Sequence, residues 1–386
     1  MNTSPKVKIL GAGPTGCLLA MSLANYDINI DISDYKTPQE LMSRDRAYAI
    51  SNSSRLFLQE INLWNQLLPY LYPFDRLIIQ DQEARSSILF NSNDLPYSDI
   101  YSSLGWILDH NDLMRILIRN LDKSNYIKAY FGSSNGYSTV DYDLVISAEG
   151  PQSSTRKELK CRQFSFKYKQ ACTTAKILMR GSPANTAYEI FRHEGPMAIL
   201  PMGNNIFQVV WSAPLDKCRY RNSLSESIFL DNLAAVMPEG LEPDIMIGKQ
   251  NYFPLSLSLP LDLSMGKHIL VGESAHTCHP VGGQGLNLSW RDVKELRTLL
   301  IKSKSNLISI KSVPKIYSRK RYFDILTIGL FTDFLIRLFS NRNLTYIVFR
   351  RFIFYLLLKL APLRKLSLKI TSYSLFADLN KKESFT

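Results

Sequence analysis

The sequence lacks the features that would assign it to several special classes. Its five cysteines are odd in number and never form a C-x-x-C pair, whereas a secreted disulfide scaffold has an even, closely spaced set. The segment MNTSPKVKIL has no apolar h-region and no small-residue cleavage site, so no signal peptide is predicted. The 18 glycines and 18 prolines are scattered, which excludes collagen-like and low-complexity sequence. We therefore expect a reduced, cytoplasmic setting.

Long uncharged apolar runs are also missing. Arg350, Arg351 and Lys359 interrupt the apolar segment 345–370, so no stretch reaches the roughly 18 to 20 residues of a membrane span. Residues 313–386 contain 14 Lys or Arg and 4 Asp or Glu, and therefore carry +10 of the net charge of +12. Because this region is apolar and aromatic as well as basic, no nucleic acid partner is expected.

Two interpretations of residues 313–386 stay open. In the first, a helix lies in a membrane interface with its basic groups against anionic lipid, which would make the protein peripheral on a membrane. In the second, the helix packs on its own domain with a solvated basic edge.

The first informative motif is a glycine-rich turn between a strand and a helix. Residues 11–16 read GAGPTG, after the strand-like run 7–10 and before the helical pattern CLLAMSLANY. In G-x-G-x-x-G, Gly11 permits the turn, Gly13 lets a pyrophosphate approach the backbone, and Gly16 lets helix and strand pack closely. An acid near the end of the next strand would hold the adenosine ribose, with Asp34 preferred over Asp31.

A second glycine-rich segment occupies residues 272–287, GESAHTCHPVGGQGLN. Its glycines and proline give a backbone that can lie flat against a planar ligand, and a helix is predicted from Leu286 onward. The helix N-terminus would stabilise negative charge on a reduced flavin. Glu273 can accept hydrogen bonds from ribityl hydroxyls.

The pattern of predicted elements indicates a mixed α/β fold, in the α+β two-domain sense. Helices are predicted around 46–69 and over 111–121, the latter capped by Asn111 or Asp112, and strands at LIIQD and SILFN. Alternating segments over 158–261 predict one antiparallel sheet. We assign residues 1–71, 97–157 and 262–312 to a discontinuous Rossmann-like FAD-binding domain, 72–96 and 158–261 to an inserted β-rich substrate domain, and 313–386 to a helical C-terminal region.

The ordered motifs resemble the class A flavin monooxygenases, and within them the ubiquinone-biosynthesis hydroxylases. The pattern G-[DE]-x-A-H-x-x-x-P-x-x-G-Q-G-x-N and GAGPTG carry the resemblance. Supporting stretches are RDRAYAISNSSRLFLQEINLW (44–64), LGWILDHNDLMRIL (104–117), YDLVISAEGPQSSTR (142–156) and EGPMAILPM (194–202). The similarity covers residues 1–300 well and the rest loosely.

The resemblance implies a role for each matching residue. Gly11, Gly13, Gly16 and Asp34 would hold the adenosine end of FAD, and Arg46 would support the cofactor near its phosphates. Glu149 and Gly150 match a motif for FAD and NAD(P)H use, and Glu273 matches the acid that holds the ribityl chain. The flavin ring would be lined by Pro280, Gly283, Gln284, Gly285 and Asn287. Both family aspartates are glutamate here, at 149 and 273, so each arm is one methylene longer.

The resemblance further implies a reaction. NAD(P)H would reduce the FAD, O₂ would add to give a C4a-hydroperoxide, and the oxygen would pass to the ring of a prenylated phenol or quinol in ubiquinone or plastoquinone biosynthesis. No protein acid or base is assigned a catalytic role, since the cofactor carries the chemistry. The expected partners are that prenylated substrate, O₂, a membrane surface and a quinone-synthesis complex.

Other interpretations were weighed against this one. The same scaffold serves flavin-dependent halogenases and geranylgeranyl-type reductases, although the W-x-W-x-I-P segment of many halogenases is absent. A non-enzymatic scaffold that carries flavin in a quinone-synthesis assembly is a further alternative. His276 and His279 are spaced H-x-x-H, but a glycine-rich loop lacks the regular backbone that aligns metal ligands, so no metal site is predicted.

Overall fold

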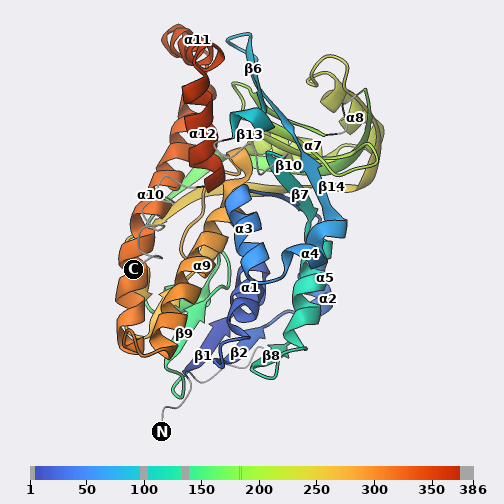
Figure 1. Ribbon diagram of the computed structural model, residues 1–386. Helices are drawn as coiled ribbons and strands as arrows, with labels where there is room; N and C mark the ends of the chain where they lie inside the picture. The colour runs from blue at the N-terminus through green and yellow to red at the C-terminus, as the bar shows by residue number, and fades with distance from the viewer. Residues whose placement is uncertain (1–4, 96–102, 133–138, 182, 184, 374–386) are drawn as a thin grey trace.

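The computed structural model describes residues 5–95, 103–132, 139–181, 183 and 185–373, which form three sheets flanked by helices (Figure 1). A six-stranded sheet has the order β15-β16-β9-β1-β2-β8. Its strands are β1 (Lys6–Leu10), β2 (Asn29–Asp34), β8 (Ile127–Phe131), β9 (Leu144–Ser147), β15 (Ser264–Met265) and β16 (His268–Leu270). All neighbours pair in parallel except β15 and β16. The inner strands are buried and apolar, as parallel strands covered on both faces require.

Helices cover this sheet and bring distant segments together. Helix α1 (Pro14–Leu23) follows β1 and packs beside both α5 (His110–Leu121) and α9 (Gln284–Lys304). Shorter helices in the first half of the chain are α2 (Pro38–Met42), α3 (Asn52–Glu60), α4 (Trp64–Leu67) and α6 (Ser154–Glu158). Single 3₁₀ turns are η1 (Leu68–Tyr70), η2 (Ser92–Asp94), η3 (Gly272–Ser274), η4 (Val281–Gly283) and η5 (Ile310–Ser312).

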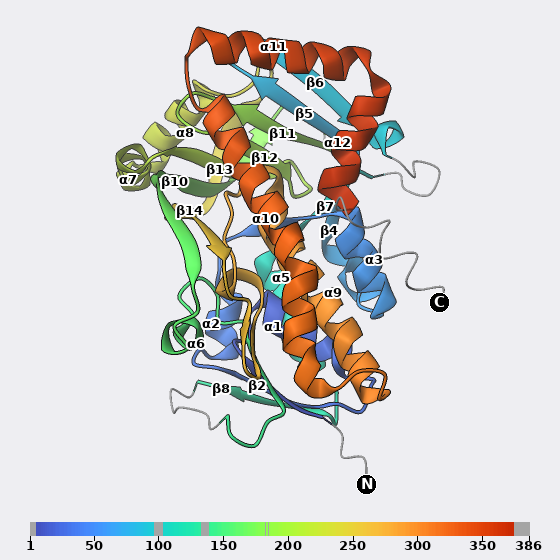
Figure 2. The ribbon, with the colours of Figure 1, turned by 90° about the vertical axis from the view of Figure 1, so that its left-hand side faces the viewer.

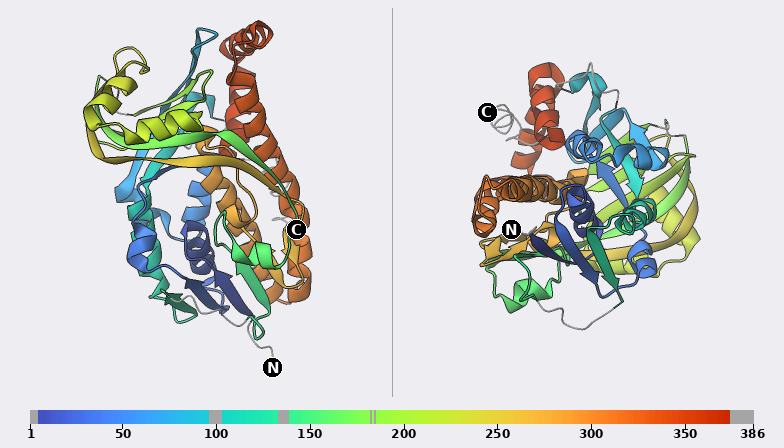
Figure 3. Two further views of the ribbon diagram at one scale, coloured as in Figure 1. Left: turned by 180° about the vertical axis from the view of Figure 1, so that it is seen from behind. Right: turned by 60° about the horizontal axis from the view of Figure 1, so that its bottom comes forward.

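A seven-stranded sheet with the order β14-β10-β13-β12-β11-β5-β6 lies above the first. Its strands are β5 (Arg76–Asp81), β6 (Ser86–Asn91), β10 (Gln163–Arg180), β11 (Thr186–Phe191), β12 (Met197–Pro201), β13 (Ile206–Pro214) and β14 (Glu242–Pro260). The long strands β10 and β14 curve from this sheet toward the six-stranded one (Figure 3, left). A three-stranded sheet of β3 (Ala47–Ile50), β7 (Gly105–Asp109) and β4 (Leu71–Phe74) completes the fold.

The seven-stranded sheet has two different faces, because side chains alternate along each strand. On the α8 face, Ile190, Val209 and Trp211 form a closed core with Phe229 of α8 (Glu226–Ala234), and α7 (Leu215–Ser223) lies nearby. The opposite face carries Ala187, Glu189, Phe191, Ala198 and Leu200, and we call it the loop face since Gly282 of η4 contacts it.

The C-terminal helices pack on both large sheets. Helix α10 (Val313–Phe339) contacts α9 and β14, α11 (Leu344–Lys359) contacts β6, and α12 (Ala361–Tyr373) contacts α3. Figure 2 shows α11 crossing strands β5 and β6 at one end of the molecule. Arg350 of α11 is fully buried and pairs with Asp81 of β5, the nitrogen and oxygen being 3.1 Å apart.

The structure confirms the predicted fold class and corrects several details. The region 46–69 begins with β3 before α3 and α4, because Tyr48 and its neighbours pair with β7. Helix α5 is capped by Asp109, whose carboxylate accepts the Asn111 N–H at 2.7 Å, not by Asn111 or Asp112. The strands within 158–261 pair antiparallel, as predicted, but β5 from the earlier segment joins this sheet in parallel with β11. The exact domain boundaries stay a prediction.

Candidate FAD site

The first glycine-rich turn is shaped by close backbone contacts. Gly11 has φ +99°, and a Cβ there would lie 2.4 Å from the carbonyl oxygen of Ala148. A Cβ on Gly16 would lie 1.9 Å from the oxygen of Gly11. Nothing lies within 4 Å of the position that a Cβ on Gly13 would take. The turn therefore requires two of its glycines for folding, and it presents the third to open space.

Helix α1 begins at this open position without a side-chain cap. Its N-cap is Gly13, and the sequence continues with Pro14 at the first helical position. The first N–H groups of a helix have no partners within the helix, and with the helix dipole they form a binding site for anionic phosphate. The turn thus has the donors and the space that a pyrophosphate needs.

Asp34 lies where the sequence predicts it, at the end of β2. Its carboxylate accepts the N–H of Ala12 at 2.8 Å and that of Lys36 at 2.9 Å. A carboxylate offers about four lone-pair sites, so two remain for ribose hydroxyls. The alternative acid, Asp31, instead accepts the hydroxyl of Tyr142 at 2.5 Å.

The second glycine-rich segment turns sharply before α9. Gly282 and Gly283 adopt left-handed conformations with φ +68° and +63°, and a Cβ on Gly283 would lie 2.9 Å from the Cβ of Ala49. Gly283 is the N-cap of α9, which begins at Gln284 and not at Leu286, and no side chain caps it. Nothing lies within 4 Å of a Cβ position on Gly285, so the start of α9 faces open space.

Asn287 holds this segment in place. Its amide nitrogen donates to the carbonyls of Ala49 (2.8 Å) and Gly283 (2.9 Å), and its oxygen accepts the hydroxyl of Ser54 at 2.7 Å and the N–H of Ser51 at 3.0 Å. The side chain is buried. Asn287 therefore connects α9 to β3 and α3, and it supports the loop with every polar atom it has.

Gln284 differs from Asn287, because one polar atom of its side chain makes no hydrogen bond within the described part of the protein. Its nitrogen donates to the Gly282 carbonyl at 3.0 Å, while its buried oxygen has no protein hydrogen-bond partner in the described part of the chain. Pro280 lies at the turn just before η4 and is half-buried. A buried polar atom without a partner marks a place where a ligand can complete the hydrogen bonding.

Glu149, which the resemblance matches to a family aspartate, accepts several hydrogen bonds through its carboxylate. Its carboxylate accepts the hydroxyls of Ser147 (2.7 Å), Ser153 (2.5 Å) and Ser154 (2.6 Å), and the N–H of Thr155. Burial alone would raise the pKa of Glu149, but these hydrogen bonds outweigh it and hold the pKa below its ordinary value. Glu149 thus closes the loop before α6.

The loop that contains Gly150 touches the second glycine-rich segment. The N–H of Gly150 donates to the Ser274 hydroxyl at 3.0 Å, and Arg156 donates to the Ser274 carbonyl at 2.7 Å. Nothing lies within 4 Å of a Cβ position on Gly150. Residues that are more than 100 positions apart in sequence therefore share one edge of the site.

Glu273 contrasts with Glu149, because its side chain is exposed. Burial raises the pKa of the Tyr48 hydroxyl. The charge of Arg46 lowers this pKa and the charge of Glu273 raises it further, so the three side chains lie in one neighbourhood. The Arg46 guanidinium lies 5.0 Å from the ring centroid of Phe253 in β14. Arg46 and Glu273 thus lie at the border between the two large sheets.

A buried ionic network fixes the start of the second segment. Asp292 of α9 accepts the N–H of Gly272 at 2.9 Å, the ring nitrogen of His276 at 2.7 Å and the guanidinium of Arg321 at 2.7 Å. Arg321 also pairs with Asp324. His276 therefore supports the loop from behind, and α10 contributes to the site although it lies outside the recognised motifs.

The predicted cofactor residues fit FAD. Two uncapped helix N-termini, the open backbone at Gly13 and Gly285, and the unpartnered oxygen of Gln284 lie on the two segments that α1 and α9 bring side by side. The open backbone at Gly150 lies on a third loop, which is hydrogen-bonded to the second segment. Asp34 and Glu273 retain acceptor capacity for ribose and ribityl hydroxyls. These groups match a dinucleotide with a planar ring.

Glu189 is a further candidate residue that the sequence motifs do not indicate. It lies on the loop face of β11 and accepts the Gly282 N–H through its Oε2 at 3.3 Å. The sequence TAYEIF (186–191) does indicate an inward-facing acid. Side chains alternate along a strand, so Glu189 shares a face with Ala187 and Phe191, and both of these are buried. Acidic side chains are rarely buried in a sheet unless they are paired, so an inward-facing Glu indicates a functional role.

Comparisons with known proteins agree with this geometry. The FAD binding domain family matches residues 120–305. An uncharacterized protein of Synechocystis sp. is 28% identical over 94% of this chain and 92% of that protein. The 3-demethoxyubiquinol 3-hydroxylase of Escherichia coli is 25% identical over 91% of this chain and 93% of that enzyme. The crystal structure of p-nitrophenol 4-monooxygenase from Pseudomonas putida has a TM-score of 0.75 at 15% identity, covering 95% of this chain and 97% of that one, and it supports the fold.

Proposed function

We propose that this chain, an FAD-dependent monooxygenase related to the ubiquinone hydroxylases, hydroxylates the ring of a prenylated phenol or quinol on the way to ubiquinone or plastoquinone. The observation that carries the proposal is the apolar loop face of the seven-stranded sheet. Val281, next to the turn before α9, packs in one cluster with Ala187 and Phe191 of β11. An aromatic ring between this sheet and a flavin would meet small and apolar side chains.

FAD, when bound, would supply the redox chemistry that couples oxidation of NAD(P)H to the addition of one oxygen atom of O₂ to the ring. The residues of this chain bind and orient. We propose that the N-termini of α1 and α9 hold the phosphates and the flavin ring, while Asp34 and Glu273 accept hydroxyls and Arg46 supports the phosphates. The loop face would exclude water from the reacting centre.

The C-terminal helices support a membrane location for such a substrate. On α11, Leu344, Val348, Phe352 and Tyr355 lie at helical spacing on one face and are 74%, 58%, 55% and 56% exposed. Residues 344–373 contain six Lys or Arg and no Asp or Glu. Among the described residues, no helix is long and apolar enough to cross a bilayer. We propose that this face, which we call the α11 stripe, lies in the interface of an anionic bilayer.

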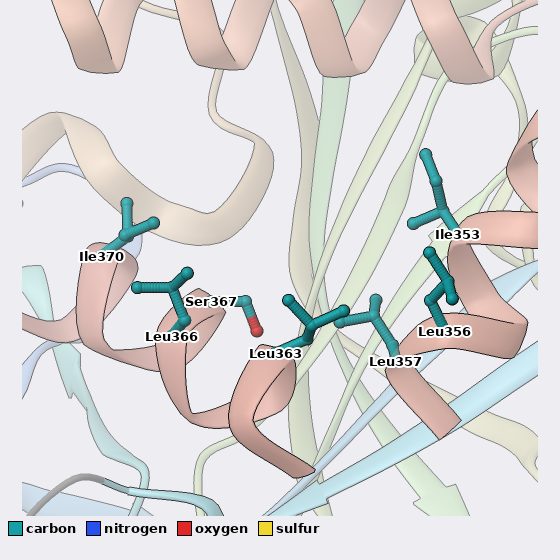
Figure 4. A pocket seen from close by; sticks show the side chains of 7 residues that line it. All are labelled: Ile353, Leu356, Leu357, Leu363, Leu366, Ser367 and Ile370. Carbon is teal, nitrogen blue, oxygen red and sulfur yellow. The ribbon is translucent and has the colours of Figure 1, made fainter. Parts of the chain in front are cut away.

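Contacts of the C-terminal helices bear on the two interpretations that the sequence leaves open. Arg350 faces inward to Asp81 and cannot contact lipid. The hollow of about 190 Å³ between α11 and α12 is lined almost entirely by apolar side chains, as Figure 4 shows. Its lining residues are Ile353, Leu356, Leu357, Leu363, Leu366, Ser367 and Ile370. The inner side of α11 thus packs on the protein, and the outer side remains for a membrane.

Flotation with anionic liposomes tests the membrane proposal. Removing residues 341–386 would also remove the buried Arg350, so surface substitutions are cleaner. We expect the double variant Val348→Ser/Phe352→Ser to lose flotation and to keep its melting temperature. The matched control Ile245→Ser changes a residue that is 52% exposed on β14 and should float as the wild type does. Unchanged flotation of the double variant would contradict the proposal.

Product analysis tests the reaction. Purified protein is incubated with NAD(P)H, O₂ and short-chain prenylphenols of the ubiquinone and plastoquinone types, and the products are identified by mass spectrometry. The proposal predicts one added oxygen atom on the ring of one substrate type. A product with reduced prenyl double bonds would indicate a reductase instead, and NAD(P)H oxidation that yields only hydrogen peroxide with every phenol would contradict the proposal.

A further inference from the structure

Among the described residues, Glu189 is the carboxylate of the loop face that is hydrogen-bonded to η4. Its direct cross-strand neighbours are Ile79 of β5 and Ala198 of β12. Its neighbours along β11 on the same face are Ala187 and Phe191, both buried. An ionised carboxylate in apolar surroundings is costly unless it is paired. A residue of this kind therefore needs an explanation beyond packing.

The contacts of Glu189 do not supply a compensating cation. Its Oε2 accepts the Gly282 N–H at 3.3 Å, which is a long hydrogen bond from a neutral donor. Burial raises the pKa of the Cys172 thiol on β10 to about 12; the charge of Glu189 adds to this shift, and Arg46 opposes it. Burial raises the pKa of Glu189 to about 7, against a small opposing effect of the Gly282 hydrogen bond. The carboxylate thus has acceptor capacity that the described residues do not use.

The position of Glu189 relates it to the substrate. Gly282 and Gly283 form the left-handed turn before α9, and by the proposed function this turn lies beside the flavin ring. By the same proposal, a side chain that contacts Gly282 from the sheet would lie beside the substrate ring. We infer that Glu189 accepts a hydrogen bond from the ring hydroxyl of the phenolic substrate and so positions the ring. This role rests on the proposed function.

The hydrogen bond would also favour the reaction. When a carboxylate draws the proton of a phenol toward itself, electron density rises at the ring carbons ortho and para to the hydroxyl. An electron-rich carbon reacts faster with an electrophilic oxygen atom. The interaction strengthens as charge develops, so it lowers the barrier and does more than bind the ground state.

The substitution Glu189→Gln separates this role from simple support of the loop. Glutamine keeps the shape and an oxygen that can accept the Gly282 N–H, and it removes the negative charge. A hydrogen bond to a charged group contributes more than a neutral one, so we expect kcat/KM for a prenylphenol to fall by about 10- to 100-fold. The flavin content and visible spectrum should stay at wild-type values. Glu242→Gln, on an exposed part of β14, is the matched control.

A substrate change completes the test. The O-methyl ether of the same prenylphenol has no hydroxyl to donate. With this ether, kcat/KM of the wild type should fall toward the value of Glu189→Gln, and kcat/KM of the variant should not fall further. In addition, kcat/KM of the wild type should rise as the pH passes about 7, and this step should vanish in the variant.

The outcomes are distinguishable. A wild type that hydroxylates the phenol, together with a Glu189→Gln variant of equal kcat/KM, overturns the role of Glu189 and leaves the proposed function standing. Equal additional losses for the methyl ether in both proteins overturn it as well. A wild type that hydroxylates no phenol overturns the proposed function, and with it this role.

Discussion

The two faces of the seven-stranded sheet differ in what they do with their side chains. The α8 face is closed, with Trp211 and Phe229 almost fully buried and in edge contact at 6.5 Å between centroids. The loop face holds small residues, such as Ala187 and Ala198, beside the acid Glu189. The same strands thus supply a core on one side and, by the proposed function, a substrate surface on the other, where Phe191 is covered by Phe339. Alternate residues of one strand would then serve stability and substrate binding separately.

The largest effect is expected on the α8 face. Phe229→Ala removes a fully buried ring, and large-to-small changes of this kind cost about 3 to 5 kcal/mol. We expect the free energy of unfolding to fall by that amount, measured by urea denaturation. At a temperature where the variant remains folded, KM for the phenol should be unchanged. A raised KM would show that the two faces are not independent.

The ion pair between Asp81 and Arg350 tests how firmly the C-terminal helices are attached to the sheet. Arg350→Met leaves Asp81 buried without its cation, which costs about 3 kcal/mol by analogy with other broken buried pairs. The double variant Asp81→Asn/Arg350→Met should recover part of the loss, since no charge remains buried. Thermal unfolding of both variants measures this, and a double variant less stable than Arg350→Met would contradict the assignment.

Low pH should reduce the free energy of unfolding through Glu194, on the α8 side of the molecule. Glu194 lies within 3.0 Å of three cations: Arg192, Lys217 and Arg221. Burial alone would raise the pKa of Glu194, but these cations outweigh it and hold the pKa at about 2. Because the folded pKa is lowered, the stabilisation is present above the unfolded pKa of about 4.3 and is lost as the pH falls toward about 2. We expect about 3 kcal/mol to disappear over this window.

Chemical denaturation at several pH values measures the effect of acid. The variant Glu194→Gln should be less stable than the wild type at neutral pH, and the difference should shrink below about pH 4. A constant difference at all pH values would show that Glu194 does not titrate as described.

Substitutions on the loop face should change stability least. They should instead change the kinetics of hydroxylation. Ala198→Phe fills space opposite Glu189, so KM for the phenol should rise about 10-fold, which corresponds to roughly 1.4 kcal/mol of binding. Ile199→Phe changes the adjacent residue on the α8 face, where overpacking costs about 1 to 3 kcal/mol of stability. Steady-state kinetics and thermal unfolding should give opposite patterns for the two variants, and equal patterns would contradict the comparison.

The sequence predicts the cofactor half of the molecule well, because local backbone geometry determines it. Gly16 is required by its contact with the carbonyl of Gly11 in the same turn, and Gly282 and Gly283 adopt the positive φ that their glycine pair indicates. The contacts of Gly11 with Ala148 and of Gly283 with Ala49 join distant parts of the chain, and no local pattern shows them. Fold class and FAD binding follow from these local signals.

Interactions between distant residues were not predictable in the same way. Asp81 and Arg350 are 269 positions apart, and no local pattern distinguishes Arg350 from the exposed basic residues near it. The role of Asn287 likewise depends on Ser54, which is 233 positions away. The serines that bond Glu149 lie within five positions of it, but the sequence does not show that their hydroxyls point to one carboxylate. Glu189 was detectable by strand alternation, yet its contact with Gly282 depends on the position of a loop 93 residues away.

A single-turnover reaction tests the central claim most directly. The FAD-loaded protein is reduced by NAD(P)H without oxygen, mixed with a short-chain prenylphenol and then exposed to O₂. The account predicts that the flavin bands return and that about one hydroxylated ring forms per flavin. If the flavin is reoxidised with hydrogen peroxide as the product and no ring is hydroxylated with any prenylphenol, the loop face is not a substrate site and the account is wrong.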